Sequence, residues 1–341
     1  MSSLSYHCKL VPILTAIFTA LFCSNALACT LVEPNPSADF GNWSSIGIQS
    51  ATPTTEAIPS AGLECEGALV GALGGLFGSD YIEATINGLN TTGSLFHLTH
   101  SEGDALSFKA FADPNFQEEI HPGATYNYSN AYLLELLGLL GTGNSAELPI
   151  FFRIDSAAGA NLQPGLYTDT LTINWNWSRC KGVDVGGLVC ILFATGTATT
   201  LIDIQLMIEA DCIVQAPQAS FGSAPLVAAF NELTQTIEIR CSKSQSYSVG
   251  LNLGLHQHSS ERRLNLGAHY LVYDIFKGPS GVESWGHIES NRRNSAAADI
   301  NPGQYDGIGM QGFIYRAVIR PNQATPPVGI YHDTVVIDVA F

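Results

Sequence analysis

The last residues of the chain alternate between apolar positions and positions of mixed character. Four apolar side chains within residues 335–341 share one face, namely Val335, Ile337, Val339 and Phe341. Alternation with a period of two predicts a β-strand with one buried face. The pattern also occurs at residues 165–177, where Gly, Tyr, Asp, Thr and Ile recur in the order and spacing of residues 329–337. The chain therefore contains two related strands, and further sequence comes after the first of them.

The relation between the two strands extends upstream into an internal repeat. A Cys, a proline-broken stretch and a Phe-Gly pair occur at residues 29–41 and again at 212–222. A second Cys follows in each copy, at Cys65 and at Cys241. An aromatic-rich segment and an Arg-bearing segment come next, and they correspond as 106–111 with 271–276 and 151–154 with 314–317. We interpret the chain as two copies of one domain.

The short alternating segments and frequent turn residues predict the fold class. The chain has 341 residues, of which only 13% are charged, and it contains 33 Gly and 16 Pro. Its length suggests two domains, and its pattern favours β structure over helix. We predict an all-β fold with two immunoglobulin-like β-sandwich domains. The expected divisions are a signal peptide at 1–28, an N-terminal domain at 29–208 and a C-terminal domain at 209–341.

The two copies differ after their shared strand. The first copy continues into another alternating segment at residues 195–208, which can close its own sandwich, whereas the second copy has no equivalent segment. A sandwich that lacks its final strand exposes an apolar groove and unpaired backbone groups, which favours aggregation. A donor strand from another subunit can complete such a domain. We expect this groove to be flanked by the apolar face of the last strand, Val335, Ile337, Val339 and Phe341.

The N-terminus has the features of a secretory signal peptide. Lys9 precedes an apolar run at residues 10–23, and Ala26-Leu27-Ala28 forms a cleavage motif before Cys29. A Cys at this position also permits lipidation. Cleavage there leaves no segment ahead of the first domain that could be donated to another subunit.

Six cysteines remain after this cleavage, and an even number in an exported chain favours disulfides. The repeat pairs the first two cysteines with each other and the last two with each other, which leaves the middle two as a third pair. The predicted disulfides are Cys29–Cys65, Cys212–Cys241 and Cys180–Cys190.

Three glycine-flanked apolar stretches in the first copy are candidate finger loops. Glycines allow sharp hairpin tips, and apolar side chains are unusual in loops because loops normally lie in water. Exposed apolar patches mark contact sites. The alternative is that these stretches pack into the core, with a short helix at 132–140. The candidate residues are Leu69, Val70, Leu73, Leu76 and Phe77 in the first stretch, Leu133, Leu134, Leu136, Leu137, Leu139 and Leu140 in the second, and Val183, Val185, Leu188 and Val189 in the third.

Several of these motifs together resemble the spore coat protein U family. The resemblance rests on the Cys-x-Val start at Cys212, the Arg-Cys-Ser at 240–242, the aromatic strand at 271–276 and the terminal strand at 329–341. It is close over 212–341 and weaker over 29–177. The two-domain layout also resembles the tip adhesins of Csu-type archaic chaperone–usher pili.

This resemblance implies a function and a set of partners. It implies a tip adhesin exported through the periplasm to the cell surface, which binds hydrophobic abiotic or biotic surfaces and promotes biofilm formation. The implied partners are a periplasmic pilus chaperone, an outer-membrane usher and a neighbouring pilus subunit that donates a β-strand. One alternative is a structural pilus or spore-coat-like fibre subunit without an adhesive role. Another is a secreted carbohydrate-binding or hydrolytic β-sandwich.

Other function classes find less support in the sequence. The net charge of −16 disfavours nucleic acid as a partner, because nucleic-acid binding needs positive charge. The pairs His97/His100 and His256/His258 have no further ligand in a recognised spacing, so we expect no metal and no cofactor. No catalytic motif stands out among the scattered acidic residues, so we expect a protein that is not an enzyme.

Overall fold

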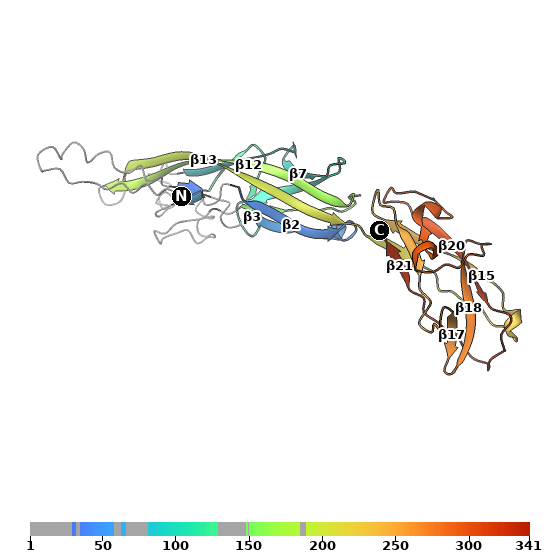
Figure 1. Cartoon of the computed structure of the whole chain (residues 1–341). Helices are drawn as coiled ribbons and strands as arrows, with labels where there is room; N and C mark the ends of the chain where they lie inside the picture. The colour runs from blue at the N-terminus through green and yellow to red at the C-terminus, as the bar shows by residue number, and fades with distance from the viewer. Residues whose placement is uncertain are drawn as a thin grey trace, which may run out of the picture.

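The structure, a computed structural model, describes residues 29–31, 35–57, 63–65, 81–128, 148, 150–184 and 189–341. Within these residues the regular structure consists of β-strands and four short 3-10 helices, so the predicted all-β class is confirmed. Two separate hydrophobic cores divide the chain into two domains, which lie end to end in Figure 1. The described residues contain no helix with the length and apolar character of a membrane span.

The first domain is built from two β-layers that face each other across its core. The layers meet at one edge, where Thr168 pairs with Thr99. One layer contains β10 (Thr125–Asn127), β5 (Tyr81–Gly88), β12 (Gly165–Asp184), β13 (Val189–Glu209) and β2 (Ser37–Ser44). The other contains β6 (Thr91–Thr92), β7 (Leu95–Thr99), β8 (Ala105–Phe111), β9 (Glu119–Ile120), β11 (Ile150–Arg153) and β3 (Thr54–Ala57). Two short elements complete the described part, the pair β1 (Cys29–Leu31) and β4 (Leu63–Cys65) and the 3-10 helix η1 (Gly47–Ser50).

The long hairpin of β12 and β13 is the main feature of the first domain (Figure 1). β13 contains the segment 195–208 that the sequence predicts as a closing strand, and it is longer than predicted at both ends. Its alternate side chains enter the core, because the period-two pattern turns every second residue inward. These buried residues are Ile202, Ile204, Leu206 and Ile208, all at most 1% exposed.

The second domain repeats this plan with fewer strands. Its core lies between two sheets and includes the fully buried Trp285 and Phe313. The five-stranded sheet has the order β14 (Cys212–Gln215), β15 (Leu233–Cys241), β20 (Gln311–Ile319), β18 (His269–Lys277) and β17 (Arg262–Leu266). The three-stranded sheet has the order β19 (Arg293–Asn294), β16 (Ser248–Leu251) and β21 (Ile337–Ala340). Three 3-10 helices connect these strands, η3 (Val227–Ala229), η4 (Glu289–Asn291) and η5 (Ser295–Ala297).

The cysteines show the correspondence between the two domains directly. Cys212 and Cys241 form the disulfide that the repeat predicts, and they lie opposite each other at one end of the β14–β15 ladder. Cys29 is also disulfide-bonded, and it is paired in register with Cys65. The first and second cysteines of each copy therefore occupy the same place in the fold.

The cysteines of the third predicted pair lie on the β12–β13 hairpin. Cys180 is in register with Phe193, and Cys190 is in register with Val183. Their side chains lie outside the described part of the structure, so a bond between Cys180 and Cys190 stays a prediction.

Candidate functional site: an open groove in the second domain

A long groove of about 910 Å³ opens the core of the second domain along one side. Its floor is formed by residues that in a closed sandwich are covered by a strand. They come from the inward-facing positions of β15, β16, β17, β18 and β20, and they are Ile237, Leu251, Leu264, Leu271, Tyr273, Ile275, Tyr315, Ala317 and Ile319. An apolar floor of this length provides burial for side chains of a bound segment.

Two extended segments form the rims of the groove. One rim follows β14 and includes residues 218–225, and the other is residues 329–337 just before and at the start of β21. Neither segment is paired with the other. The two rims therefore stand apart on either side of the exposed core.

Along the second rim, one backbone edge is bonded and the other faces the groove. The even-numbered residues hydrogen bond away from it: His332 pairs with Asn265, and the carbonyl of Thr334 accepts from the N–H of Leu255 at 3.0 Å. In the described part of the chain, the backbone groups of Tyr331, Asp333 and Val335 have no hydrogen-bond partner. These groups form the open edge of a strand, to which another strand can be added.

The first domain shows what fills the same space. The Phe-Gly pair places β2 of the first domain and residues 218–225 of the second in equivalent positions, and the Tyr-x-Asp-Thr motif does the same for β12 and residues 329–337. Between β2 and β12 lies β13, which runs parallel to β2 and antiparallel to β12. The groove of the second domain is therefore the space that β13 occupies in the first.

The rim of the groove is held in place by a polar cluster around Asp333. The carboxylate of Asp333 accepts hydrogen bonds from the hydroxyl of Tyr273 at 2.7 Å and from the backbone N–H of His256 at 3.1 Å. Burial raises the pKa of Tyr273, and the neighbouring carboxylate adds to this effect. Tyr273 therefore stays protonated and keeps donating to the rim at ordinary pH.

The equivalent carboxylate in the first domain is Asp169, and its surroundings differ. It is 4% exposed and accepts from the side-chain amide of Asn90 at 3.2 Å. Burial raises the pKa of Asp169 to about 6, and hydrogen bonds to its oxygens oppose this rise only in part. Closing the sandwich with β13 thus places a carboxylate in a poorly solvated position.

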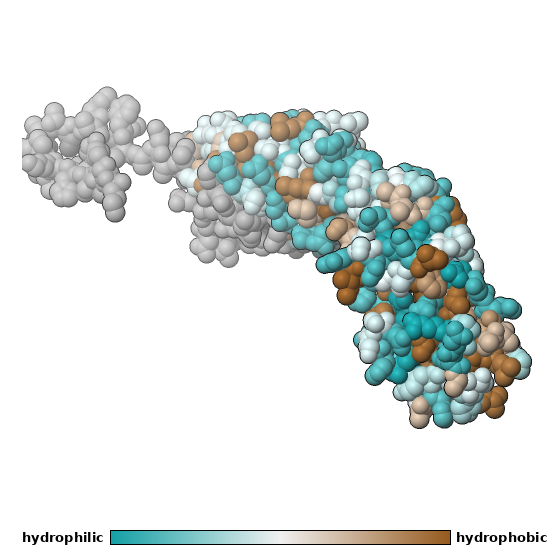
Figure 2. All heavy atoms as spheres, turned by 45° about the vertical axis from the view of Figure 1, so that its right-hand side comes forward, coloured by the Kyte–Doolittle hydropathy of each residue, from teal (hydrophilic) through white to brown (hydrophobic). Residues whose placement is uncertain are grey.

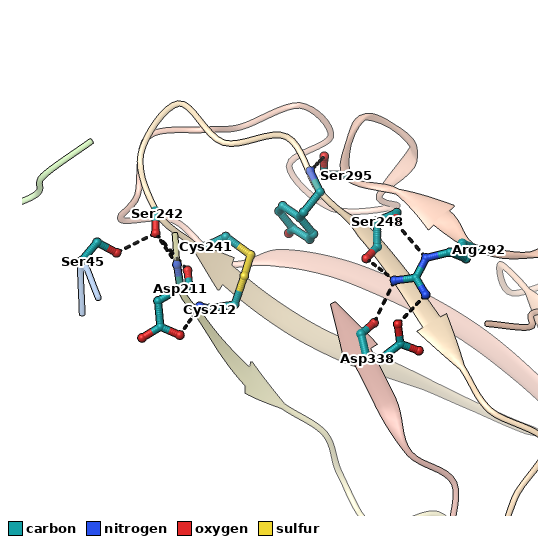
Figure 3. The surroundings of a disulfide bond; sticks show 10 residues. Ser45, Asp211, Cys212, Cys241, Ser242, Ser248, Arg292, Ser295 and Asp338 are labelled. Carbon is teal, nitrogen blue, oxygen red and sulfur yellow. Dashed lines mark hydrogen bonds and ion pairs between the residues drawn. A yellow bond between two sulfur atoms is a disulfide. The ribbon is translucent and has the colours of Figure 1, made fainter. Parts of the chain in front are cut away.

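The final strand is fixed to its neighbour by Arg292. The guanidinium contacts a carboxylate oxygen of Asp338 on β21, and it donates from Nε to the hydroxyl of Ser248 at 2.8 Å (Figure 3). It also donates to the backbone carbonyl of Ser248 at 2.8 Å. Because Ser248 belongs to β16, this single side chain joins β21 to β16 and positions the rim that leads into β21.

The four residues predicted to flank the groove have different environments. Val335 and Ile337 line it, whereas Val339 packs against the core beside β16. Phe341 is 58% exposed. Regular strand geometry begins only at Ile337, later than the predicted start at residue 329, because the preceding residues are bonded along one edge only.

Most of the candidate finger residues lie outside the described part of the structure. This applies to the whole of the first two stretches, 67–78 and 132–141, and to Val185 and Leu188 of the third. The backbone of the third stretch can be followed at its base, where Asp184 is in register with Val189 near the tip of the β12–β13 hairpin. The positions of the finger side chains stay predictions.

Apolar residues also reach the surface of the second domain outside the groove. Figure 2 shows several such areas among residues of mixed polarity. Three of them alternate with the groove-facing residues of the second rim and point away from the groove, namely Val328, Ile330 and Val336, which are 103%, 84% and 54% exposed. Within the described ranges, no three His, Cys, Asp or Glu side chains gather in a way that could hold a metal ion.

Sequence reasoning missed much of this groove. It identified one rim from the terminal alternation, but it did not identify the opposite rim at 218–225 or the floor. The floor could have been found from the inward positions of the two aromatic-rich strands, where Leu271, Tyr273 and Ile275 alternate. The opposite rim has no such signal, because prolines interrupt its pattern and its correspondence to β2 depends on a short Phe-Gly match.

Comparison with known proteins supplies relatives for both domains. The profile of the Spore Coat Protein U domain matches residues 14–174 and residues 198–338. No curated protein sequence matches the chain significantly.

Among solved structures, the chain is similar to one described as the CsuC-CsuE chaperone–tip adhesion subunit pre-assembly complex from archaic chaperone-usher Csu pili of Acinetobacter baumannii. The TM-score is 0.61 at 24% identity, over 92% of this chain and 100% of that chain. The complex of the CFA/I fimbriae chaperone and tip adhesin gives a TM-score of 0.28 at 10% identity, over 89% and 94% of the two chains. The CFA/I adhesin CfaE of enterotoxigenic E. coli gives 0.32 at 11% identity, over 90% and 92%.

Proposed function

The chain belongs to the Spore Coat Protein U domain family, and on this premise we propose that it is a subunit of a chaperone–usher pilus. Its second domain accepts a β-strand from another polypeptide. The observation that carries this proposal is the open groove between residues 218–225 and 329–337, whose counterpart in the first domain is filled by β13.

β13 describes the kind of strand that fits the groove. Ile202 lies opposite Leu171 of β12, and Ile204 lies opposite Asp169; the equivalent residues of the second domain are Val335 and Asp333. The donor strand therefore runs antiparallel to residues 329–337 and parallel to residues 218–225. It carries apolar side chains at four alternate positions, which at about 1.5–3 kcal/mol for each buried side chain contribute roughly 6–12 kcal/mol before the cost of ordering the strand.

The partners follow from this need for a strand. A periplasmic chaperone supplies it during export, an outer-membrane usher receives the complex, and a neighbouring pilus subunit supplies the final donor strand. The proposed location is therefore the cell surface, reached through the periplasm. The solved complex with a similar two-domain fold contains a chaperone and a tip adhesion subunit, which supports both the chaperone and a position at the tip.

The first domain is proposed to be the adhesive part. It closes its own sandwich with β13, so its remaining surface is free to bind. The apolar stretches at 67–78, 132–141 and 183–189 are its proposed contacts with hydrophobic surfaces, and attachment through many pili supports biofilm formation. The role proposed for the whole chain is structural and adhesive rather than catalytic.

A fusion protein tests the strand-accepting role. Residues 200–209, the groove-filling part of β13, are appended after Phe341 through a flexible linker, so that the added strand can fold back antiparallel into the groove. The matched control carries the same segment with serine at the positions of Ile202, Ile204, Leu206 and Ile208. We expect the fusion to be monomeric and to unfold at a higher temperature than the control. Equal stability and equal aggregation of the two proteins contradict the proposal.

A further inference from the structure

A single strand connects the far end of the first domain with the second domain. β13 begins at Val189, beside the tip of the hairpin, and ends at Glu209, after 21 residues. At about 3.3 Å per residue it spans roughly 70 Å. Tension applied near the hairpin tip therefore reaches Glu209 along one backbone (Figure 1). It is resisted there in shear, because many hydrogen bonds to β12 must break together.

Only two residues separate β13 from the disulfide of the second domain. Cys212 is the first residue of β14, and it is bonded to Cys241, the last residue of β15 (Figure 3). The same point is fixed by hydrogen bonds, since the N–H of Asp211 donates to the hydroxyl of Ser242 at 2.7 Å and the N–H of Ser242 donates to the carbonyl of Asp211 at 2.9 Å. Tension from the first domain thus enters the second domain at this cross-link.

The residues after Cys241 also contact the first domain. The hydroxyl of Ser242 lies 2.6 Å from that of Ser45, and Nζ of Lys243 lies 2.5 Å from a carboxylate oxygen of Asp104. The end of β15 is therefore joined to the first domain independently of β14. β15 itself is an inner strand, with β14 on one side and β20 on the other.

The groove begins four residues after Cys212, at Ala216. Pulling on the first residue of an antiparallel strand pair opens its hydrogen bonds one after another, starting at that residue, because the load falls on one pair at a time. Without a cross-link, tension entering at Cys212 peels β14 from β15. Continued peeling then pulls residues 218–225 away from the donor strand.

We infer that the Cys212–Cys241 disulfide shields the acceptor groove from tension. The cross-link passes the load from Cys212 directly to Cys241 and the inner strand β15, so β14 and the rim behind it stay unloaded. The donor strand is then held as firmly under tension as at rest. This inference rests on the proposed function, because it assumes that the groove holds a donor strand and that the first domain is pulled.

Single-molecule pulling on the full chain tests the inference. The probe is a synthetic donor peptide with the sequence of residues 200–209, bound in the groove. One handle is placed on this peptide and the other on the exposed Thr197 of β13. The variant C212S/C241S removes the cross-link, and C29S/C65S is the matched control, because it removes the equivalent cysteines of the first domain.

We expect the peptide to be lost roughly tenfold faster from C212S/C241S under load, which corresponds to about 1.4 kcal/mol, the order of one backbone hydrogen bond. An extension of about 30 Å, from the release of roughly ten residues, should precede the loss. The C29S/C65S variant and the wild type should hold the peptide equally. A second geometry, with the handle moved to the exposed turn residue Gly267, should make the three proteins equal, because the load then bypasses Cys212.

The outcomes separate this inference from the proposed function. If C212S/C241S loses the peptide faster by the same factor in both geometries and at zero force, the disulfide stabilises the domain without regard to load, and the inference is wrong. Equal lifetimes for all proteins in the first geometry also overturn it. If the wild type does not bind the peptide at zero force, the strand-accepting role itself fails.

Discussion

Leu206 lies directly opposite Tyr167 in the ladder between β13 and β12, and it covers the core at the point where the Tyr-x-Asp-Thr motif begins. The equivalent residue of the second domain, Tyr331, faces a groove. Two copies of one motif thus occur in one chain with and without the strand that completes them. The first domain therefore serves as an internal reference for the second.

Val335 and Val336 are adjacent but face opposite ways, so they form a matched pair of test positions. Val335 lines the groove, and Val336 is 54% exposed on the other side. We expect Val335→Asp to abolish capture of a donor strand, because a carboxylate buried beneath that strand has no partner charge. Val336→Asp should retain capture. Co-purification of each variant with a strand-donating partner measures the difference, and equal losses speak against the assigned faces.

Arg292 should contribute more to stability than the ion pair with Asp338 alone indicates. Asp338 is 44% exposed at its side chain, so its removal should cost only about 0.5–1 kcal/mol. Replacing Arg292 with Ala also leaves the hydroxyl and carbonyl of Ser248 without this donor, and we expect a cost of about 2–4 kcal/mol. Urea unfolding of the strand-completed protein compares the two variants. A larger loss for Asp338→Ala than for Arg292→Ala contradicts this account.

Asp169 predicts how the stability of the first domain depends on pH. Its pKa of about 6 in the folded chain lies above the value near 3.9 of an unfolded Asp, so the folded state binds the proton more tightly. The stabilisation is therefore complete below about pH 4 and is lost as pH rises through about 6. We expect Asp169→Asn to reduce the fall in melting temperature between pH 4 and pH 7. An unchanged pH profile in the variant excludes Asp169 as its source.

The finger hypothesis concerns residues outside the described structure, and it needs a test in cells. We predict that changing Leu73, Leu137 and Leu188 to Asp, singly and together, reduces the adhesion of piliated cells to polystyrene while pili persist. Counting pili in the same cultures is the control. Loss of pili places these residues in the core instead, and unchanged adhesion places the binding surface elsewhere on the first domain.

The sequence predicts the parts of this fold that depend on local pattern. Alternation at 195–208 identifies the closing strand, and the spacing of Cys212 and Cys241 within the repeat identifies their bond. The parallel pairing of β13 with β2 is not predictable in this way, because it joins residues more than 160 positions apart and leaves no period in either strand. The extent of the groove is hidden for a similar reason. The terminal alternation places Val335 and Phe341 on one face, but only the neighbouring strands determine that Val335 lines the groove while Phe341 is exposed.

Hydrogen exchange at the second rim tests the central claim most directly. The claim is that the backbone edge of Tyr331, Asp333 and Val335 receives a donor strand. The measurement compares these three amides in the fusion that carries residues 200–209 with the same amides in its serine control. The account predicts that they become as protected as the core amides of β20 in the fusion and exchange quickly in the control. Fast exchange in both proteins, or protection in both, contradicts it.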